Sequence, residues 1–288
     1  MLAEIDTALG AWGPLVAGAV GLLIGSFLNV VITRLPVMLE RQWHAEARAI
    51  LESERSEAAG ERFDLVRPRS RCPNCQRPIR ALENVPILSF VFLRGRCPGC
   101  GLGISWQYPA VELITAILFV ITIWHLGITP GGLLALVFTS VLIAAATIDA
   151  RTTLLPDQLT QPLLWLGLMV NIPGTFTDLQ SAVIGAIAGY LTLWLVFHGF
   201  RLVTGKEGMG FGDFKLLAAL GAWLGWQALP VILLLASLAG AVVGIALILL
   251  LGRDRNIPIP FGPYLAVAGW LALLWGDPLL AMYFPHGL

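Results

Sequence analysis

Residues 133–149, LLALVFTSVLIAAATID, form an apolar run that ends on a carboxylate, Asp149. A run of this length is close to the roughly 20 residues that one helix needs to cross a bilayer. A second carboxylate, Asp213, lies between the glycine-rich segment GMGFG at 208–212 and another apolar run that begins at Phe214. Because a carboxylate at the edge of the bilayer core is costly, each of the two residues indicates a functional role.

The composition of the whole chain predicts an integral membrane protein. Of the 288 residues, 57% are hydrophobic and only 12% are charged, whereas soluble domains carry about 25% charged residues. The formal net charge is zero, so nothing indicates nucleic-acid binding. The first apolar run has no Lys or Arg before it and no small-residue cleavage site after it, which indicates a retained span rather than a signal peptide.

Eight apolar runs predict an all-α, polytopic fold of about eight transmembrane helices in contact with the lipid bilayer. Residues 214–252 are too many for one helix, and the turn QALP at 227–230 divides them. The predicted spans cover residues 14–32, 110–126, 131–148, 159–173, 181–203, 213–226, 230–251 and 261–275.

The distribution of basic residues predicts the orientation of these spans. With the N-terminus outside, all 18 Lys and Arg residues fall on one face of the membrane, and the loops on the other face have none. The positive-inside rule makes the basic face cytoplasmic. Asp149 and Asp213 both lie at this face, so the sequence predicts that the two carboxylates face the cytoplasm.

A polar segment divides the chain into three predicted parts. They are a first transmembrane helix at 1–32, a cytoplasmic insertion at 33–108, and a seven-helix membrane domain at 109–288 that carries both carboxylates. Within the insertion, residues 37–59 are rich in Ala, Glu and Arg and have apolar residues at helical spacing. They predict an amphipathic helix on the membrane surface or against the rest of the insertion; the alternative is a solvated helix with one apolar stripe.

The insertion contains all four cysteines of the chain, in two pairs. Cys72-Pro-Asn-Cys75 and Cys97-Pro-Gly-Cys100 have the spacing of a small zinc-ribbon-like lobe, in which two knuckles supply four thiolates to one ion. The alternatives are two disulfides or four free thiols, and a cytoplasmic location disfavours disulfides. A site with four Cys ligands is closed, so the expected zinc is structural and stabilises a lobe too small to fold alone.

The two carboxylates predict shared-proton chemistry if they meet. Asp149 and Asp213 held close together cannot both ionise easily, so one stays protonated and polarises a scissile carbonyl while the other takes a proton from water. Glycines beside the second carboxylate allow a backbone or an extended substrate to come close. These glycines are Gly208, Gly210 and Gly212.

Other roles for the pair stay open on these grounds. Asp213 suits the N-cap of the helix that follows it, and Asp149 has Arg151 as a possible ion-pair partner. A proton-coupled transporter also uses paired aspartates, but its sites lie near the bilayer midplane rather than at one face. A membrane scaffold that docks a partner through the cysteine lobe leaves the glycine-flanked Asp213 unexplained.

Further polar residues near the predicted site are candidates for supporting roles. Glu112, just inside the second span, suits a substrate or cofactor contact, with an interhelical hydrogen bond as the alternative. Lys215 suits binding of a substrate carboxylate, although it lies on a different helical face from Asp213. Asp157 is the rival to Asp149, with helix capping as its alternative, and His198 suits a packing role.

Several stretches, in order along nearly the whole chain, resemble the bacterial type IV prepilin peptidase family. Besides the two Cys-x-x-Cys pairs, they are GSFLNVVITRLP at 25–36, YPAVEL at 108–113, LLPD at 154–157, GKEGMGFGDFK at 205–215 and PIPFGP at 258–263. The shorter Gly-x-Gly-Asp element is also similar to that of presenilin-type proteases.

The resemblance implies a bifunctional enzyme of the bacterial inner membrane. Family members cut the leader from prepilins and from type II secretion pseudopilins on the cytoplasmic side, then N-methylate the new terminal residue with S-adenosylmethionine. The resemblance makes Asp149 and Asp213 the catalytic dyad of the membrane domain and the four cysteines the zinc ligands. It assigns no residues to the methyl donor, and the chain has no Gly-x-Gly-x-x-Gly after a strand.

Overall fold

A computed structural model describes residues 10–51, 63–206, 208–252 and 259–283 of the chain. These residues are helical apart from turns and two isolated β-bridges, as the all-α prediction requires. The chain divides into two compact units, an N-terminal unit, Leu9–Trp124, and a C-terminal unit that consists essentially of His125–Leu288. The predicted boundary between insertion and membrane domain, at 108/109, lies inside the N-terminal unit.

The N-terminal unit is built on two helices, α2 (Gly13–Leu51) and α4 (Gln107–Leu126). Small residues of α2 allow the two backbones to approach closely, because a Cβ at Gly21 would lie 2.7 Å from Cα of Ala116 and one at Gly25 would lie 2.7 Å from Cα of Glu112. Such contacts are typical of helix pairs in membranes, where packing rather than the hydrophobic effect holds helices together.

Residue 32, the predicted end of the first span, is not the end of a helix. Helix α2 continues through Pro36 without interruption, so the span and the amphipathic segment form one helix as far as Leu51. The rest of the predicted amphipathic helix, residues 52–59, lies outside the described residues. Arg34 of α2 binds the insertion, since its guanidinium donates to the carbonyls of Asp64 at 2.9 Å and Pro68 at 2.7 Å.

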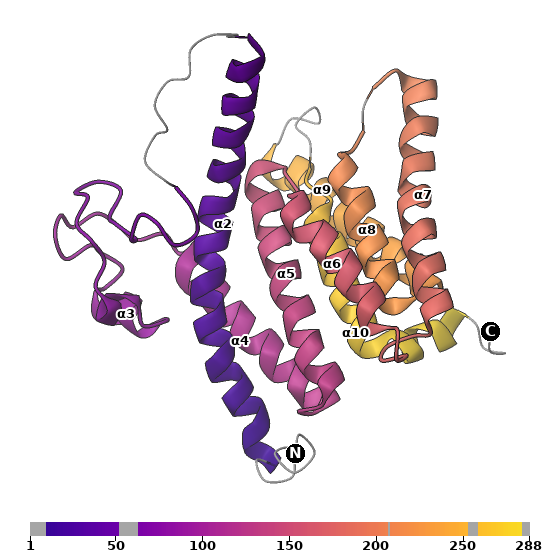
Figure 1. Cartoon of the computed structure of the whole chain (residues 1–288), viewed down its shortest axis with the longest axis horizontal. Coiled ribbons are helices and arrows are strands. Elements are labelled where there is room, and N and C mark those ends of the chain that lie inside the picture. Colours follow the sequence, from indigo (N-terminus) through magenta and orange to yellow (C-terminus); the bar gives the residue numbers. More distant parts are fainter. Residues whose placement is uncertain (1–9, 52–62, 207, 253–258, 284–288) are drawn as a thin grey trace. The chain divides into compact units, whose positions relative to one another are not determined.

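The C-terminal unit is a bundle packed around one short helix, α8 (Phe211–Leu224). Ten residues of α8 from Asp213 to Trp223 are buried, which fits a helix that is apolar on every side. Figure 1 shows the helices that pack with it. The helices of the bundle around α8 are α5 (Pro130–Thr152), α6 (Asp157–Val170), α7 (Leu179–Thr204), α9 (Leu229–Leu251) and α10 (Gly262–Tyr283).

The side chain of Asn171 anchors the C-terminal end of α8. Asn171 is fully buried and donates to the carbonyls of Ala222 and Trp223, both at 2.9 Å, while its own carbonyl accepts the N–H of Phe176. These bonds satisfy carbonyls that the end of a helix leaves without intrahelical partners. Gly221 adds a close approach of α8 to α7, because a side chain there would collide with the backbone of Gly185.

Eight described helices of 14 residues or more correspond to the eight predicted spans. Five of them are long and apolar enough to cross a membrane, and the apolar part of α10 is shorter. Helices α6 and α8 have 14 residues each, and at about 1.5 Å per residue they do not reach across a core of roughly 30 Å. The structure therefore supports a membrane protein but not eight complete crossings.

Candidate active site and metal centre

The C-terminal unit places Asp149 and Asp213 at the same end of its bundle. Asp149 lies in the last turn of α5 and Asp213 in the first turn of α8, with exposed fractions of 4% and 6%. The two carboxyl groups are close enough to interact electrostatically. Two buried acidic groups at one end of the bundle are the arrangement in which proton sharing was predicted.

Asp213 is the third residue of its helix and not the N-cap that the alternative predicted, although its carboxyl group reaches back to the N-cap residue. The N-cap of α8 is Gly210, whose extended backbone precedes the first helical residue, Phe211. The carboxyl group of Asp213 interacts with the backbone N–H of Gly210. Its Oδ1 atom is buried and has no hydrogen-bond partner among the described residues. An orphaned buried carboxyl oxygen is costly and is a common property of a group that acts on a substrate.

Asp149 is held by a residue to which the sequence assigned no role. Its Oδ2 atom accepts the backbone N–H of Gly262, the first residue of α10, at 2.9 Å. A Cβ on Gly262 would lie 2.7 Å from the same oxygen, so this approach requires glycine. Among the described residues Asp149 makes no ion pair with Arg151. Gly262 lies in the stretch PIPFGP at 258–263, which contributes to the family resemblance. Nothing else in the sequence indicated a role for this glycine.

Leu155 closes one side of this site. A Cβ on Gly212 would lie 2.5 Å from Cβ of Leu155, and one on Gly262 would lie 3.0 Å from its Cδ1 atom. Gly212 thus lets the start of α8 pack on the segment between α5 and α6. Gly210, in contrast, has open space at its Cα, since the nearest atom to a Cβ there is the backbone N of Gly212 at 4.0 Å.

Lys215 and Asp157 pair with each other rather than with the dyad. Nζ of Lys215 donates to both oxygens of Asp157, at 2.6 and 2.7 Å. Asp157 is the first residue of α6, whose N-cap is Pro156, so it does not cap the helix either. As predicted, His198 packs among rings, with its centroid 4.0 Å from that of Trp194.

The four cysteines of the insertion form one cluster in the N-terminal unit. Their Sγ atoms all lie within 4.8 Å of one another, and none of the four forms a disulfide. The two knuckles have the same turn, in which the amide four residues after the first cysteine donates to its carbonyl, at 3.0 Å in the first knuckle and 2.8 Å in the second. The disulfide alternative is therefore wrong, and the cluster has the geometry of a metal site.

The electrostatics of the cluster favour a bound cation. Hydrogen bonds from the backbone amides of Cys75 and Asn74 lower the pKa of the Cys72 thiol to about 6. At Cys75 the amide of Arg77 also favours the thiolate, but desolvation and the neighbouring sulfurs outweigh it and raise the pKa to about 11. Four sulfurs this close cannot all ionise without a cation, and a shared metal ion would favour the thiolate form of each.

Glu112 lies in the N-terminal unit, whereas Asp149 and Asp213 lie in the C-terminal unit. Its side chain contacts the insertion. It is 7% exposed, and its Oε2 atom accepts the backbone N–H of Ile87 at 2.8 Å. Ile87 has φ of +57°, an unfavourable conformation for a β-branched residue. Glu112 therefore holds a strained turn of the insertion against α4, and it also interacts with Ser26 of α2, in agreement with the interhelical alternative.

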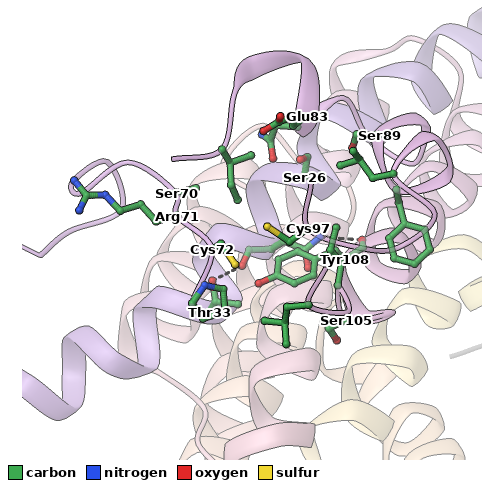
Figure 2. A pocket seen from close by; sticks show the side chains of 18 of the residues that line it. Ser26, Thr33, Ser70, Arg71, Cys72, Glu83, Ser89, Cys97, Ser105 and Tyr108 are labelled. Carbon is green, nitrogen blue, oxygen red and sulfur yellow. Dashed lines mark hydrogen bonds between the residues drawn. The ribbon is translucent and has the colours of Figure 1, made fainter. Parts of the chain in front are cut away.

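Glu112 also lines a cavity of about 440 Å³ inside the N-terminal unit. Figure 2 shows its walls, which come from α2, from the cysteine lobe and from the first turns of α4. Cys72 and Cys97 line it as well, so the metal site and the cavity share a wall.

Comparisons with known proteins agree with the two-unit division. Residues 19–126 match the bacterial peptidase A24 N-terminal domain, and residues 136–245 match the type IV leader peptidase family. The first match contains the four cysteines, and the second contains Asp149 and Asp213. No solved structure matches the chain.

Three relatives are similar over nearly their whole length, and each bears the name prepilin leader peptidase/N-methyltransferase. That of Aeromonas salmonicida is 59% identical over 263 residues, or 91% of this chain and 90% of the relative. That of Aeromonas hydrophila is 58% identical over 93% and 92% of the two chains, and that of Pseudomonas aeruginosa is 53% identical over 91% and 90%. The chain therefore belongs to the type IV leader peptidase family.

Proposed function

We propose that this chain is a membrane aspartic endopeptidase that removes the leader of type IV prepilins and then N-methylates the new N-terminal residue. The names of relatives that match over nine-tenths of the chain support both activities. The proposal of a peptidase activity rests on one observation, the buried and interacting pair Asp149 and Asp213 at one end of the bundle.

The surroundings of the two carboxyl groups give them different roles. The N–H of Gly262 donates to Asp149 and stabilises its ionised form. The carboxyl group of Asp213 also interacts with the N–H of Gly210, but its buried Oδ1 atom has no donor among the described residues. We therefore assign the shared proton to Asp213, which polarises the scissile carbonyl. Asp149 then takes a proton from the attacking water. The sharing of one proton is a property of the pair, so removal of either carboxylate stops the reaction.

The substrate is a membrane helix with a polar N-terminal extension. Its scissile bond must be unwound before water can attack it, and the open space at Gly210 admits an extended backbone beside Asp213. The positive-inside distribution of the basic residues supports a cytoplasmic location for this end of the bundle, in a protein of the bacterial inner membrane. Pseudopilins of type II secretion have the same substrate chemistry and belong to the same substrate class.

The metal of the cysteine cluster is zinc, held by Cys72, Cys75, Cys97 and Cys100. Four sulfurs within 4.8 Å of one another fit its tetrahedral thiolate coordination. Such a site has no open position for water, so its chemistry is structural. The ion stabilises the insertion, and the hydrolytic step uses the two aspartates alone.

Cleavage of a membrane-embedded prepilin by purified variants tests the peptidase. Asp149→Asn and Asp213→Asn each lose cleavage, with the same expression and zinc content as the wild type. Asp178→Asn is the matched control, because Asp178 is also in the C-terminal unit but caps the start of α7 by accepting the N–H of Ser181 at 2.9 Å. Full cleavage by either dyad variant would remove that residue from the mechanism.

A further inference from the structure

The connection between α5 and α6 places a leucine, Leu155, between the two segments that hold the carboxyl pair. The C-cap of α5 is Thr153, which has φ of +53° and donates its N–H to the carbonyl of Asp149 at 2.8 Å. The N-cap of α6 is Pro156, so only Leu154 and Leu155 lie between the two caps. A connection this short fixes Leu155 relative to the last turn of α5, to which Asp149 belongs.

The side chain of Leu155 is 8% exposed and packs on glycines of both segments. Its Cβ atom lies 2.5 Å from the position of a Cβ on Gly212, the residue before Asp213, and its Cδ1 atom lies 3.0 Å from that of a Cβ on Gly262. The N–H of Gly262 is the donor to Asp149. One apolar side chain therefore contacts the chain neighbour of one carboxyl group and the hydrogen-bond donor of the other.

The first turn of α8 depends on packing for its position. Its N-cap residue is a glycine, which has no side chain to cap the helix. Phe211 and Phe214 contact Phe197 of α7, with ring centroids 5.3 and 5.7 Å from that of Phe197. Leu155 packs on Gly212, which lies between these two rings in the sequence. In a close-packed interior, a change of volume at such a contact shifts the elements that it separates.

We propose that Leu155 is a positioning residue of the peptidase, which sets the separation of Asp149 and Asp213 by packing against Gly262 and Gly212. The inference rests on the proposed peptidase activity. Proton sharing between two buried carboxyl groups depends on their separation, because their electrostatic interaction weakens as the distance grows. A smaller side chain at position 155 leaves a void into which the starts of α8 and α10 relax, and the two carboxyl groups then lose their mutual placement.

Leu155 lies apart from the space that the proposed function gives to the substrate. No atom of Leu155 lies within 4 Å of the position of a Cβ on Gly210. Substitution of Leu155 should therefore change the chemical step and not the binding of the substrate, so that kcat falls while KM stays the same. A side chain that only stabilises the fold would leave the kcat of the folded enzyme unchanged.

Steady-state cleavage of a membrane-embedded prepilin tests this role, with the full-length protein in lipid nanodiscs and below the unfolding temperature of every variant. We expect Leu155→Ala to lower kcat by about tenfold or more, with KM within about twofold of the wild type. Leu155→Met has an unbranched Cβ and a side chain long enough to reach Gly262, so it should retain most of the turnover.

The matched control is Leu163→Ala. Leu163 is 1% exposed in α6, and its carbonyl accepts the N–H of the Trp223 ring at 2.8 Å, at the C-terminal end of α8. This variant also loses buried apolar volume beside α8, but away from the carboxyl pair. It should lower the thermal unfolding temperature at least as much as Leu155→Ala and keep the wild-type kcat.

Wild-type kcat in Leu155→Ala, or a loss confined to KM, overturns the positioning role. The peptidase itself stands in that case if Asp149→Asn loses cleavage in the same assay. An equal loss of kcat in Leu163→Ala also overturns the role, because destabilisation alone then explains the effect. If Leu155→Ala does not fold, Leu155→Val decides by the same criteria, since valine is apolar but has no Cδ1 atom. A wild type that leaves the leader intact overturns the proposed function instead.

Discussion

The backbone N–H of Gly262 donates a hydrogen bond to the carboxylate of Asp149, although the two residues are 113 positions apart in the sequence. The bond joins the start of α10 to the end of α5 and fixes one member of the carboxyl pair. It does not use a side chain of α10, so its only sequence requirement is that no Cβ be present at position 262.

Gly262→Ala is expected to lower kcat for leader cleavage by about a hundredfold, because the added Cβ would lie 2.7 Å from Oδ2 of Asp149 and would displace it. The control is Gly276→Ala in the same helix, where a Cβ meets nothing within 4 Å. Steady-state kinetics on a membrane-embedded prepilin measures both. Normal turnover by Gly262→Ala would show that Asp149 does not depend on this approach.

The two glycines before Asp213 are expected to differ. Gly212→Ala collides with Leu155, at 2.5 Å between the Cβ atoms, and should reduce both cleavage and the thermal unfolding temperature. Gly210→Ala meets open space with φ of −86° and keeps its N–H, so it should keep the unfolding temperature and weaken cleavage only, because the added Cβ enters the space proposed for the substrate backbone. Full cleavage by Gly210→Ala would show that the substrate backbone does not use this space.

The pair Asp157 and Lys215 is expected to contribute little to catalysis. Asp157→Asn should still cleave the leader, and a double-mutant cycle with Lys215→Met should give a coupling free energy of about 1 kcal/mol or less, as for other partly exposed ion pairs. Chemical or thermal unfolding measures the coupling, and prepilin cleavage measures the function. If Lys215→Met alone raises KM, then Lys215 leaves Asp157 to bind the substrate.

Removal of the metal is expected to unfold the insertion but not the bundle. A chelator, or Cys75→Ser, should expose residues 63–106 to protease, because a lobe with two isolated β-bridges and one short helix has little apolar core. Zinc content and limited proteolysis are measured on the same samples, and restored zinc should reverse both changes.

Asn171→Leu is expected to destabilise the C-terminal unit by about 2–3 kcal/mol. The change leaves the carbonyls of Ala222 and Trp223 without their buried donor and the N–H of Phe176 without its acceptor. Thermal inactivation in lipid nanodiscs measures it. The control is Asn84→Leu, an exposed residue of the insertion.

Local patterns predicted much of this molecule. The spacing of Cys72, Cys75, Cys97 and Cys100 predicted one cluster, because ligand spacing in a knuckle is a local property. Apolar runs predicted the position of the long helices, and the basic loops placed Asp149 and Asp213 at one end. The break after residue 32 was wrong, because α2 accommodates Pro36 inside the helix and a change from apolar to polar residues does not end a helix.

Contacts between distant segments were not predictable in the same way. No periodicity connects Gly262 to Asp149, Asn171 to the end of α8, or Lys215 to Asp157. Each of these pairs depends on how separate helices pack, and a single sequence contains no signal for that packing. The residues themselves are ordinary, and only their neighbours give them a role.

The arrangement of α10 determines how much of the chain a working fragment must contain. The matched segment of the type IV leader peptidase family ends at residue 245, before α10 begins at Gly262. A fragment cut at that limit would retain both aspartates. It would lack Gly262, whose backbone N–H holds Asp149. Split-protein complementation with a separate piece that carries α10 would then be required to restore turnover.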